Sequence, residues 1–241
     1  TAEPLDGAAV PGRREAARYQ WAEYLDGVDV TALAPEGDAM WLGLGPARHE
    51  GDEEPPGTLV RMDIATGGRV AYSPPDGPPW VHDIAIDAEG TKWLVSYAGV
   101  IRFDGEECES YEEDGGQSDD EYYSGGYGVH AVAVDSTGQI WCADGSFNGD
   151  RAGQGVMVFN GREWRRLTGP EIEGWRPLFL RRTWVDQILP DAEGGVWLLE
   201  ARRDGGLLLH YRGGGQWRAY TQFYDDVYPR PNAAAIDKEG R

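Results

Sequence analysis

The sequence predicts an all-β protein, a β-propeller built of four-stranded antiparallel blades, and three observations support this fold class. A ten-residue phrase recurs along the 241 residues, in its clearest copy as VHDIAIDAEG at residues 81–90. Tryptophans follow successive copies at a shared position, spaced by 52, 48 and 56 residues: Trp41, Trp93, Trp141 and Trp197. Short apolar runs between glycine turns read as strands. A period of about 50 residues fits one propeller blade and exceeds leucine-rich and ankyrin repeats.

The strands of one blade can be followed in order through the second copy. An alternating run at residues 84–86 predicts the first strand, Asp-x-x-Gly at 87–90 a tight turn, and Trp93 the start of the second strand. Residues 100–105 (VIRFDG) predict a third strand that ends in an aromatic residue and a turn. The fourth strand is short, and its clearest example is WRRL at 164–167 in the third copy. The sequence therefore predicts four complete blades, at about 28–72, 81–111, 129–167 and 185–220.

The two ends of the chain predict a split fifth blade. Residues 19–24 match the pattern of a fourth strand, and residues 231–241 begin a further copy of the repeat. This blade would lack its second and third strands, so we expect the chain to be a fragment of a larger propeller. The propeller is thus expected over residues 19–241, after an N-terminal extension at 1–18.

The order of these motifs is similar to a known repeat. A hydrophobic strand, Asp-x-x-Gly, Trp, then Phe-Asp-Gly and Trp-x-x-Tyr resembles the two-component regulator propeller repeat, over roughly residues 19–241. In that family such blades form the extracytoplasmic sensing region of hybrid histidine kinases, and they also occur in secreted and surface proteins without a kinase. The sequence has no kinase motif, so the resemblance implies only an extracytoplasmic propeller.

Composition limits the partners of the protein. Acidic residues outnumber basic ones 42 to 22, which gives a net charge of −20. This charge repels a phosphate backbone, so we expect no nucleic-acid partner. No apolar run approaches the length of a membrane-spanning helix, so we expect no membrane insertion.

The second residue of every repeat copy is polar, and these five residues form the first candidate site: Asp29, His82, His130, Asp186 and Asn232. Because first strands line the axial channel of a propeller, their side chains are expected to meet near one channel mouth. Imidazoles and carboxylates there suit a transition metal or a polar ligand. A hydrated channel mouth, or packing between blades, explains the same pattern.

The loop that follows the second strand of the third blade has the spacing of a calcium loop. Oxygen-bearing side chains occupy every second position of this loop, with a glycine at position 149: Asp144, Ser146, Asn148 and Asp150. Calcium binds such oxygens, although serine and asparagine replace carboxylates here and no glutamate stands at the twelfth position. Calcium is the one cofactor that the sequence indicates, and an ordinary polar loop is the alternative.

Aromatic residues outside the repeat position add further ligand-binding candidates. Tyr122 and Tyr123 lie in a long acidic connection, where they could stack on a sugar, cover a partner surface or simply be solvated. Trp80 and Trp184 stand two residues before two of the polar positions. The four tryptophans at the shared repeat position are instead expected to be buried between blades.

These observations predict a non-enzymatic binding or sensor module. Its loop-rich channel face would recognise a small molecule, a glycan or a protein. Two alternatives stay open: a propeller lyase or hydrolase that uses His82 and His130 at the channel mouth, and a purely structural surface protein. No serine-nucleophile elbow or phosphate-binding glycine loop occurs in a convincing context.

Overall fold

A computed structural model describes nine segments of the chain: residues 29–45, 58–72, 81–96, 99–111, 129–144, 155–167, 185–200, 207–220 and 234–236. Sixteen strands in these segments form four antiparallel sheets, each of four strands paired in sequence order. The first two sheets contain β1 (Val30–Glu36), β2 (Ala39–Leu44), β3 (Thr58–Asp63), β4 (Arg69–Tyr72), β5 (Asp83–Ile86), β6 (Lys92–Ser96), β7 (Gly99–Phe103) and β8 (Cys108–Tyr111). The other two contain β9 (Val129–Val134), β10 (Ile140–Asp144), β11 (Gly155–Phe159), β12 (Trp164–Leu167), β13 (Gln187–Pro190), β14 (Val196–Glu200), β15 (Leu207–Tyr211) and β16 (Trp217–Tyr220).

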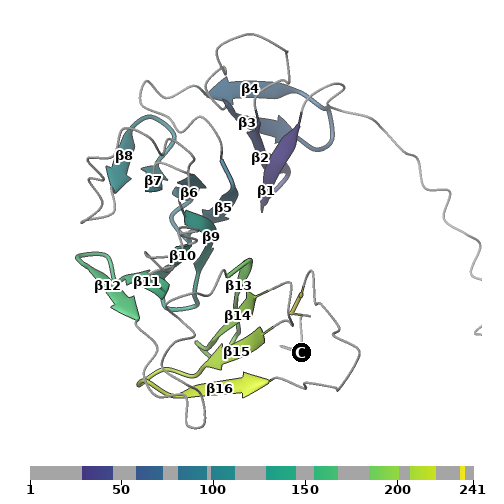
Figure 1. The fold of residues 1–241 in the computed structure, drawn as a ribbon. Helices are drawn as coiled ribbons and strands as arrows, with labels where there is room; N and C mark the ends of the chain where they lie inside the picture. The colour runs from purple at the N-terminus through teal and green to yellow at the C-terminus, as the bar shows by residue number, and fades with distance from the viewer. Residues whose placement is uncertain are drawn as a thin grey trace, which may run out of the picture.

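The four sheets are arranged as successive blades around an arc (Figure 1). The first strand of each blade lies at its inner edge: β5 contacts β1 on one side and β9 on the other, and β9 contacts β13. The all-β fold class and the four complete blades are therefore confirmed. Among the described residues, none belongs to a helix with the length and apolarity needed to cross a membrane.

The core lies between neighbouring blades, where the repeat tryptophan of one blade meets an aromatic residue of the next. Trp41 lies 6.2 Å from Phe103 and Trp93 lies 5.7 Å from Phe159, measured between ring centroids. Trp141 approaches Tyr211 in the same way, at 5.3 Å. The three tryptophans are 2%, 4% and 2% exposed. These three therefore seal the three interfaces between the four blades, as predicted.

Trp197 differs from the other three, and the expectation that it is buried is wrong. It is only partly buried. Its neighbours Val196 and Leu198 pack against the third blade, so Trp197 is on the opposite face of its sheet. There it stacks on His210, with ring centroids 4.0 Å apart and planes 5° apart. Its three equivalents are buried against the following blade, and after the fourth blade the structure describes only residues 234–236.

A shared arrangement of hydrogen bonds explains the Asp-x-x-Gly-x-x-Trp spacing. In the third blade, Asp135 Oδ1 accepts hydrogen bonds from the backbone N–H groups of Thr137 and Gln139, at 2.8 and 3.0 Å. Asp135 Oδ2 accepts from Trp141 Nε1 at 2.8 Å. Gly138 has a φ of 83°, which a residue with a side chain rarely adopts. The aspartate thus fixes the turn with one oxygen and the core tryptophan with the other.

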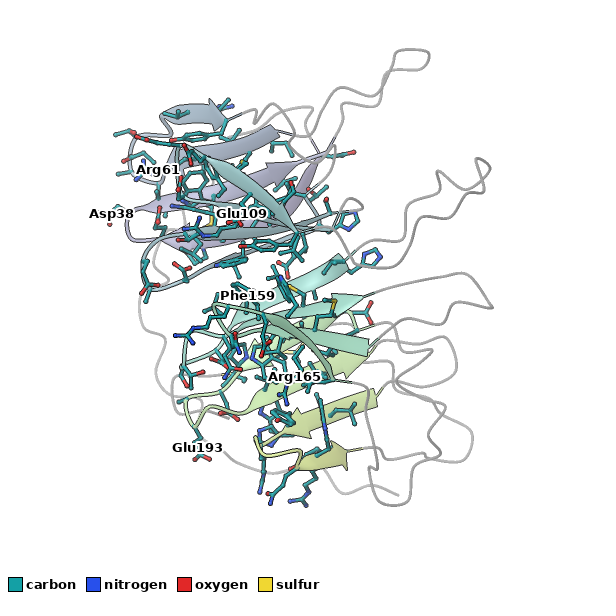
Figure 2. The ribbon with its side chains drawn as sticks, turned by 90° about the vertical axis from the view of Figure 1, so that its left-hand side faces the viewer. Asp38, Arg61, Glu109, Phe159, Arg165 and Glu193 are labelled. Carbon is teal, nitrogen blue, oxygen red and sulfur yellow. The ribbon has the colours of Figure 1, made fainter. Side chains whose placement is uncertain are left out.

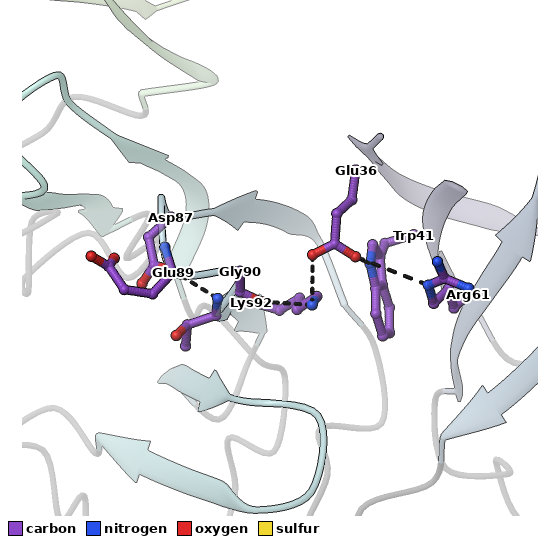
Figure 3. A network of polar contacts seen from close by, with 8 residues as sticks. Glu36, Trp41, Arg61, Asp87, Glu89, Gly90 and Lys92 are labelled. Carbon is purple, nitrogen blue, oxygen red and sulfur yellow. Dashed lines mark hydrogen bonds and ion pairs between the residues drawn. The ribbon is translucent and has the colours of Figure 1, made fainter. Parts of the chain in front are cut away.

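The first blade replaces this aspartate with Glu36, which also connects the blade to the second (Figure 3). Its Oε2 accepts from Trp41 Nε1 at 2.7 Å, and its Oε1 pairs with Lys92 Nζ at 2.9 Å. Lys92 is buried, donates to Gly90 O at 2.6 Å and lies 4.5 Å from the Trp41 ring centroid. Burial raises the pKa of Glu36, but hydrogen bonds from Trp41 and Lys92 outweigh it and hold that pKa below its ordinary value.

Only a short piece of the expected fifth blade falls within the described residues. The backbone N–H of Ala234 donates to Gln187 Oε1 of β13 at 2.7 Å, so residues 234–236 lie beside the inner strand of the fourth blade. The remainder of the predicted split blade, residues 19–24, 231–233 and 237–241, lies outside the described residues.

Candidate functional site

Four of the five polar repeat residues are described, and they occupy the same end of the blades. We call Asp29, His82, His130 and Asp186 the leading row, because each stands at or just before the start of an inner strand. The backbone of His82 donates to Val95 O at 2.7 Å and that of Asp186 donates to Leu199 O at 2.8 Å. The carbonyl of Asp29 accepts from Gly45 N at 2.8 Å. Val95 and Leu199 are the last residues but one of β6 and β14, whereas Gly45 follows β2. The row therefore lies at one end of the blades, with Asp29 two residues out of register with His82 and Asp186.

The opposite end of the blades carries the turns between first and second strands. Asp38 in the first blade and Glu193 in the fourth lie in these turns, and Figure 2 shows both on the same side of the molecule. The leading row is at the other end of the same strands. Substitutions of Asp38 and Glu193 can therefore serve as controls for substitutions in the leading row.

The two histidines of the leading row come together, as the repeat register predicted. The rings of His82 and His130 stack with their centroids 4.9 Å apart and their planes 6° apart. His82 Nδ1 lies 3.3 Å from the carbonyl oxygen of Val129, to which it donates when that nitrogen carries the proton. Both side chains are partly buried. The inner strands of the second and third blades thus present one stacked pair of imidazoles.

The surroundings favour neutral imidazoles. Burial lowers the pKa of His82, partly opposed by its hydrogen bond to the Val129 carbonyl. Burial and the neighbouring charge of His82 lower the pKa of His130 to about 4. Both rings are therefore neutral at pH 7. A neutral imidazole has one donor nitrogen and one acceptor nitrogen.

Asp83, immediately after His82, joins the same two blades. Its Oδ1 accepts from the backbone of Ile84 at 2.9 Å, and its Oδ2 accepts from the backbone of Val132 in β9 at 3.0 Å. Burial raises the pKa of Asp83 to about 6, against these two hydrogen bonds. Burial, followed by the charge of Asp83, also raises the pKa of the Cys142 thiol.

The role of Asp83 was missed from the sequence, although a signal was present. Gln187 holds the same repeat position in the fourth blade and bonds the corresponding backbone N–H, that of Ala234. An oxygen-bearing side chain at the third position of a copy therefore connects its inner strand to the next one. Ala32 and Ala131 stand at this position in the strand register of the first and third blades, so among the four described blades only the second and the fourth carry the feature.

A transition-metal site at the leading row has no support among the described residues. No three His, Cys, Asp or Glu side chains in this part of the chain gather as a metal ion requires. Asp29 and Asp186 are exposed, whereas the two histidines are partly buried. The arrangement instead combines a stacked imidazole pair with a carboxylate on the preceding blade and another on the following blade.

The other predicted site residues lie outside the described residues, except for Asp144, whose backbone is described. Asp144 ends β10, and its Cα partner in the neighbouring strand is Val129, just before His130. The predicted calcium loop therefore begins at the same end of the blades as the leading row. The described segments do not include the remaining candidates: Asn232, Trp80, Trp184, Tyr122, Tyr123, Ser146, Asn148 and Asp150.

Comparisons with known proteins agree with the fold. No protein-family model matches the chain, and neither does any curated protein. A xyloglucanase from Xanthomonas campestris superimposes with a TM-score of 0.58 and 18% identity, over 86% of this chain and 32% of that chain. A catalytically inactive histidine-to-alanine variant of virginiamycin B lyase from Staphylococcus aureus, with quinupristin, gives 0.56 and 11%, over 81% and 56%. The chain is a β-propeller.

These propellers define the fold without defining an activity. The chain spans about half of the lyase and a third of the xyloglucanase, at identities that carry no function across. The extracellular domain of a one-component system from B. thetaiotaomicron has a TM-score of only 0.40, with 13% identity over 88% of this chain and 38% of that chain. The finer resemblance to two-component regulator propellers therefore stays a prediction.

Proposed function

We propose that this chain is a non-enzymatic binding or sensor module that takes a small molecule, a glycan or a protein at the end where the leading row lies. The stacked pair of His82 and His130 is the observation that carries this proposal. The pair presents polar, flat, partly exposed rings at a position where every blade supplies a polar side chain. Binding residues commonly lie where a rigid scaffold brings several connections together.

A binding screen of the purified chain tests this proposal. We expect a ligand from glycan, peptide and metabolite libraries to raise the melting temperature, because binding to the folded state alone stabilises it. The variant H82Q/H130Q keeps polar side chains of similar size and should lose that shift. The control variant D38N/E193Q changes the opposite end and should keep it. A ligand whose effect survives H82Q/H130Q would move the site away from the leading row.

A lyase or hydrolase is the second candidate, because the two neutral imidazoles can accept protons at pH 7. A histidine-to-alanine variant of virginiamycin B lyase, itself a propeller, is catalytically inactive. Mass spectrometry of each ligand after incubation with the protein distinguishes the two candidates. Unchanged ligand supports a binding module. Product that forms with wild type and not with H82Q/H130Q supports the enzyme.

The same proposal includes an extracytoplasmic location, in a secreted or surface-associated protein. The resemblance of the repeat to extracytoplasmic sensing propellers supports it. Fractionation of the producing cells, with immunodetection of the native protein in the medium, the envelope and the cytoplasm, tests this. Recovery in the cytoplasm alone contradicts it.

A further inference from the structure

The first blade has an apolar face on the side that points away from the second blade. We call it the first-blade face and define it by six residues: Leu33, Met40, Leu42, Leu44, Val60 and Met62. In its outer part, Val60 and Met62 of β3 are only 6% and 9% exposed, whereas Leu33 of β1 is 60% exposed. We propose that residues 20–24 of this chain dock on the outer part of this face, with the Tyr24 ring against Met62.

The burial of Val60 and Met62 has no source among the described elements. Their cluster contains residues of the first blade alone, because the second blade packs on the opposite face, against Trp41 and Leu59. A side chain on an open sheet face stays in contact with water, as Leu33 does. Burial on β3 without burial on β1 therefore requires a cover from a segment outside the described ranges.

The interfaces between the described blades show which strand covers β3 of a following blade. Tyr72, at the end of β4, lies 5.4 Å from Phe103 of β7, measured between ring centroids. Tyr111, at the end of β8, lies 5.5 Å from Phe159 of β11 in the same way. Met62 holds the register position of these phenylalanines in the first blade. In both interfaces, the tyrosine that ends a fourth strand thus covers the third strand of the next blade.

Residues 20–24 have the sequence of such a fourth strand. They read QWAEY, and residues 216–220, which contain β16, read QWRAY. In β16 the tryptophan packs toward the third blade and Tyr220 faces the other side. Since successive side chains of a strand alternate, Tyr24 can face the first blade in the same way. A methionine suits the tyrosine ring, because its sulfur makes favourable contacts with aromatic rings.

The link between Tyr24 and the first blade is long enough for this position. Tyr24 stands six residues before Val30, where β1 begins. Six extended residues span up to ~20 Å. The outer strand of one blade and the inner strand of the next are separated by roughly 18 Å, since strands lie about 4.8 Å apart and packed sheets about 10 Å apart. The link reaches with little slack, which restricts residues 20–24 to the position beside the first blade.

A second copy of the chain fits the same face less well. Figure 1 shows the first and fourth blades at the two ends of the arc, so the fourth blade of another copy would have to meet the first-blade face. The position after the fourth blade is already taken: the Ala234 N–H donates to Gln187 Oε1, as the Val132 N–H donates to Asp83 between the second and third blades. A cover from the chain's own residues 20–24 avoids this clash.

Photocrosslinking in the full chain tests the contact. p-Benzoylphenylalanine in place of Tyr24 should crosslink to the peptide that contains Met62, because a benzophenone reacts with the side chain that it contacts. The same group in place of Glu23 is the matched control and should give little of this product, since neighbouring residues of a strand face opposite sides. A mixture of isotope-labelled and unlabelled protein should give products within one isotope only.

Thiol labelling provides a second measurement. M62C should react with maleimide at least tenfold more slowly than L33C, because Leu33 is exposed. Adding Tyr24→Lys places a charge at an apolar contact, so it should raise the M62C rate at least tenfold and leave the L33C rate unchanged. Peptide mass spectrometry separates these sites from the native cysteines. Cys142 is buried and should stay unlabelled in every variant, which excludes global unfolding as the cause.

Three results overturn the inference. Crosslinks between the two isotopes identify a second copy of the chain as the occupant of the first-blade face. Crosslinks from position 24 to another blade, or none to the peptide of Met62, place residues 20–24 elsewhere. An M62C rate that does not respond to Tyr24→Lys, while Cys142 stays protected, shows that another segment covers β3.

Discussion

Each Asp-x-x-Gly turn depends on a single aspartate whose two oxygens have different partners. Asp87 and Asp135 each accept backbone N–H groups with Oδ1 and the indole N–H of the repeat tryptophan with Oδ2. In the fourth blade Asp191 Oδ2 is bonded to His210 Nε2 at 2.7 Å instead. His210 thus takes the place of the indole, and Trp197 stacks on it. In this blade the histidine bonds the turn aspartate, and the tryptophan stacks on the histidine instead of bonding the aspartate itself.

Replacement of the repeat tryptophans by alanine should show this difference. Trp141 is buried and bonded to Asp135, so Trp141→Ala should lower the free energy of unfolding by about 3–5 kcal/mol. Trp197→Ala should cost roughly half of that or less, because Trp197 is partly exposed and Asp191 keeps its bond to His210. Urea unfolding measures both values, and equal costs would contradict the distinction.

His130 should make the fold sensitive to acid. Its pKa is about 4 in the folded protein and about 6.5 when unfolded, so the unfolded chain binds more protons between these values. Stability should therefore rise with pH from about 4 to 6.5, and this contribution is lost as pH falls. Urea unfolding of H130Q from pH 4 to 7 should show a smaller loss on acidification than wild type. An identical pH profile for the two proteins would contradict the lowered pKa.

At the scale of the strand, polar side chains fix each inner strand against its neighbour. Asp83 accepts from the backbone of β9, Gln187 accepts from Ala234, and Thr31 Oγ1 donates to Val81 O at 2.6 Å. A β-sheet edge offers unpaired backbone groups, and these bonds satisfy some of them across the blade interface. The inner strands are therefore joined by specific bonds as well as by apolar packing.

Replacement of Asp83 by asparagine should reveal the charge buried at this junction. The pKa of Asp83 is raised to about 6, so the folded state binds more protons than the unfolded state between about pH 4 and 6. This contribution to stability is present at low pH and is lost as pH rises, opposite in sign to that of His130. The stability of D83N relative to wild type should therefore increase from pH 4 to 7. A stability difference between D83N and wild type that stays constant from pH 4 to 7 would show that the pKa of Asp83 is not raised.

The predicted calcium loop is a second test at the scale of an element. Asp144 pairs with Val129 at the end of β10, so an ion bound by Asp144 would lie at the same end of the blades as the leading row. Millimolar calcium should raise the melting temperature of wild type and leave D144N unchanged, since only an ion that binds the folded state stabilises it. Magnesium is the control. Equal responses to the two ions, or none, would identify an ordinary polar loop.

For the whole molecule, the sequence was sufficient for the architecture because the repeat constrains many residues at once. Trp41, Trp93 and Trp141 share one register and therefore one environment. The same register predicted that His82 and His130 lie near one another, whereas the stacking of their rings is seen only in the structure. The stacking of Trp197 on His210 did not follow from the register, because it depends on which residue stands on the neighbouring strand β15 of the same blade. Bonds such as Asp83 to Val132 depend on the distance between two strands, which no single copy encodes.

The net charge of −20 gives a last prediction for the whole chain. Like charges repel in the compact state, and salt reduces this repulsion because the Debye length falls from about 30 Å at 0.01 M to about 8 Å at 0.15 M. The Lys92–Glu36 pair opposes the trend, but Lys92 is buried and therefore poorly screened. Melting temperature should accordingly rise by a few degrees between 10 and 300 mM NaCl, since about 1 kcal/mol corresponds to roughly 2–4 °C at this size. Sucrose of equal osmolality is the uncharged control and should give a smaller rise. A melting temperature that falls with NaCl would mean that attractive pairs, such as those of Glu36 with Lys92 and Arg61, dominate over the net charge.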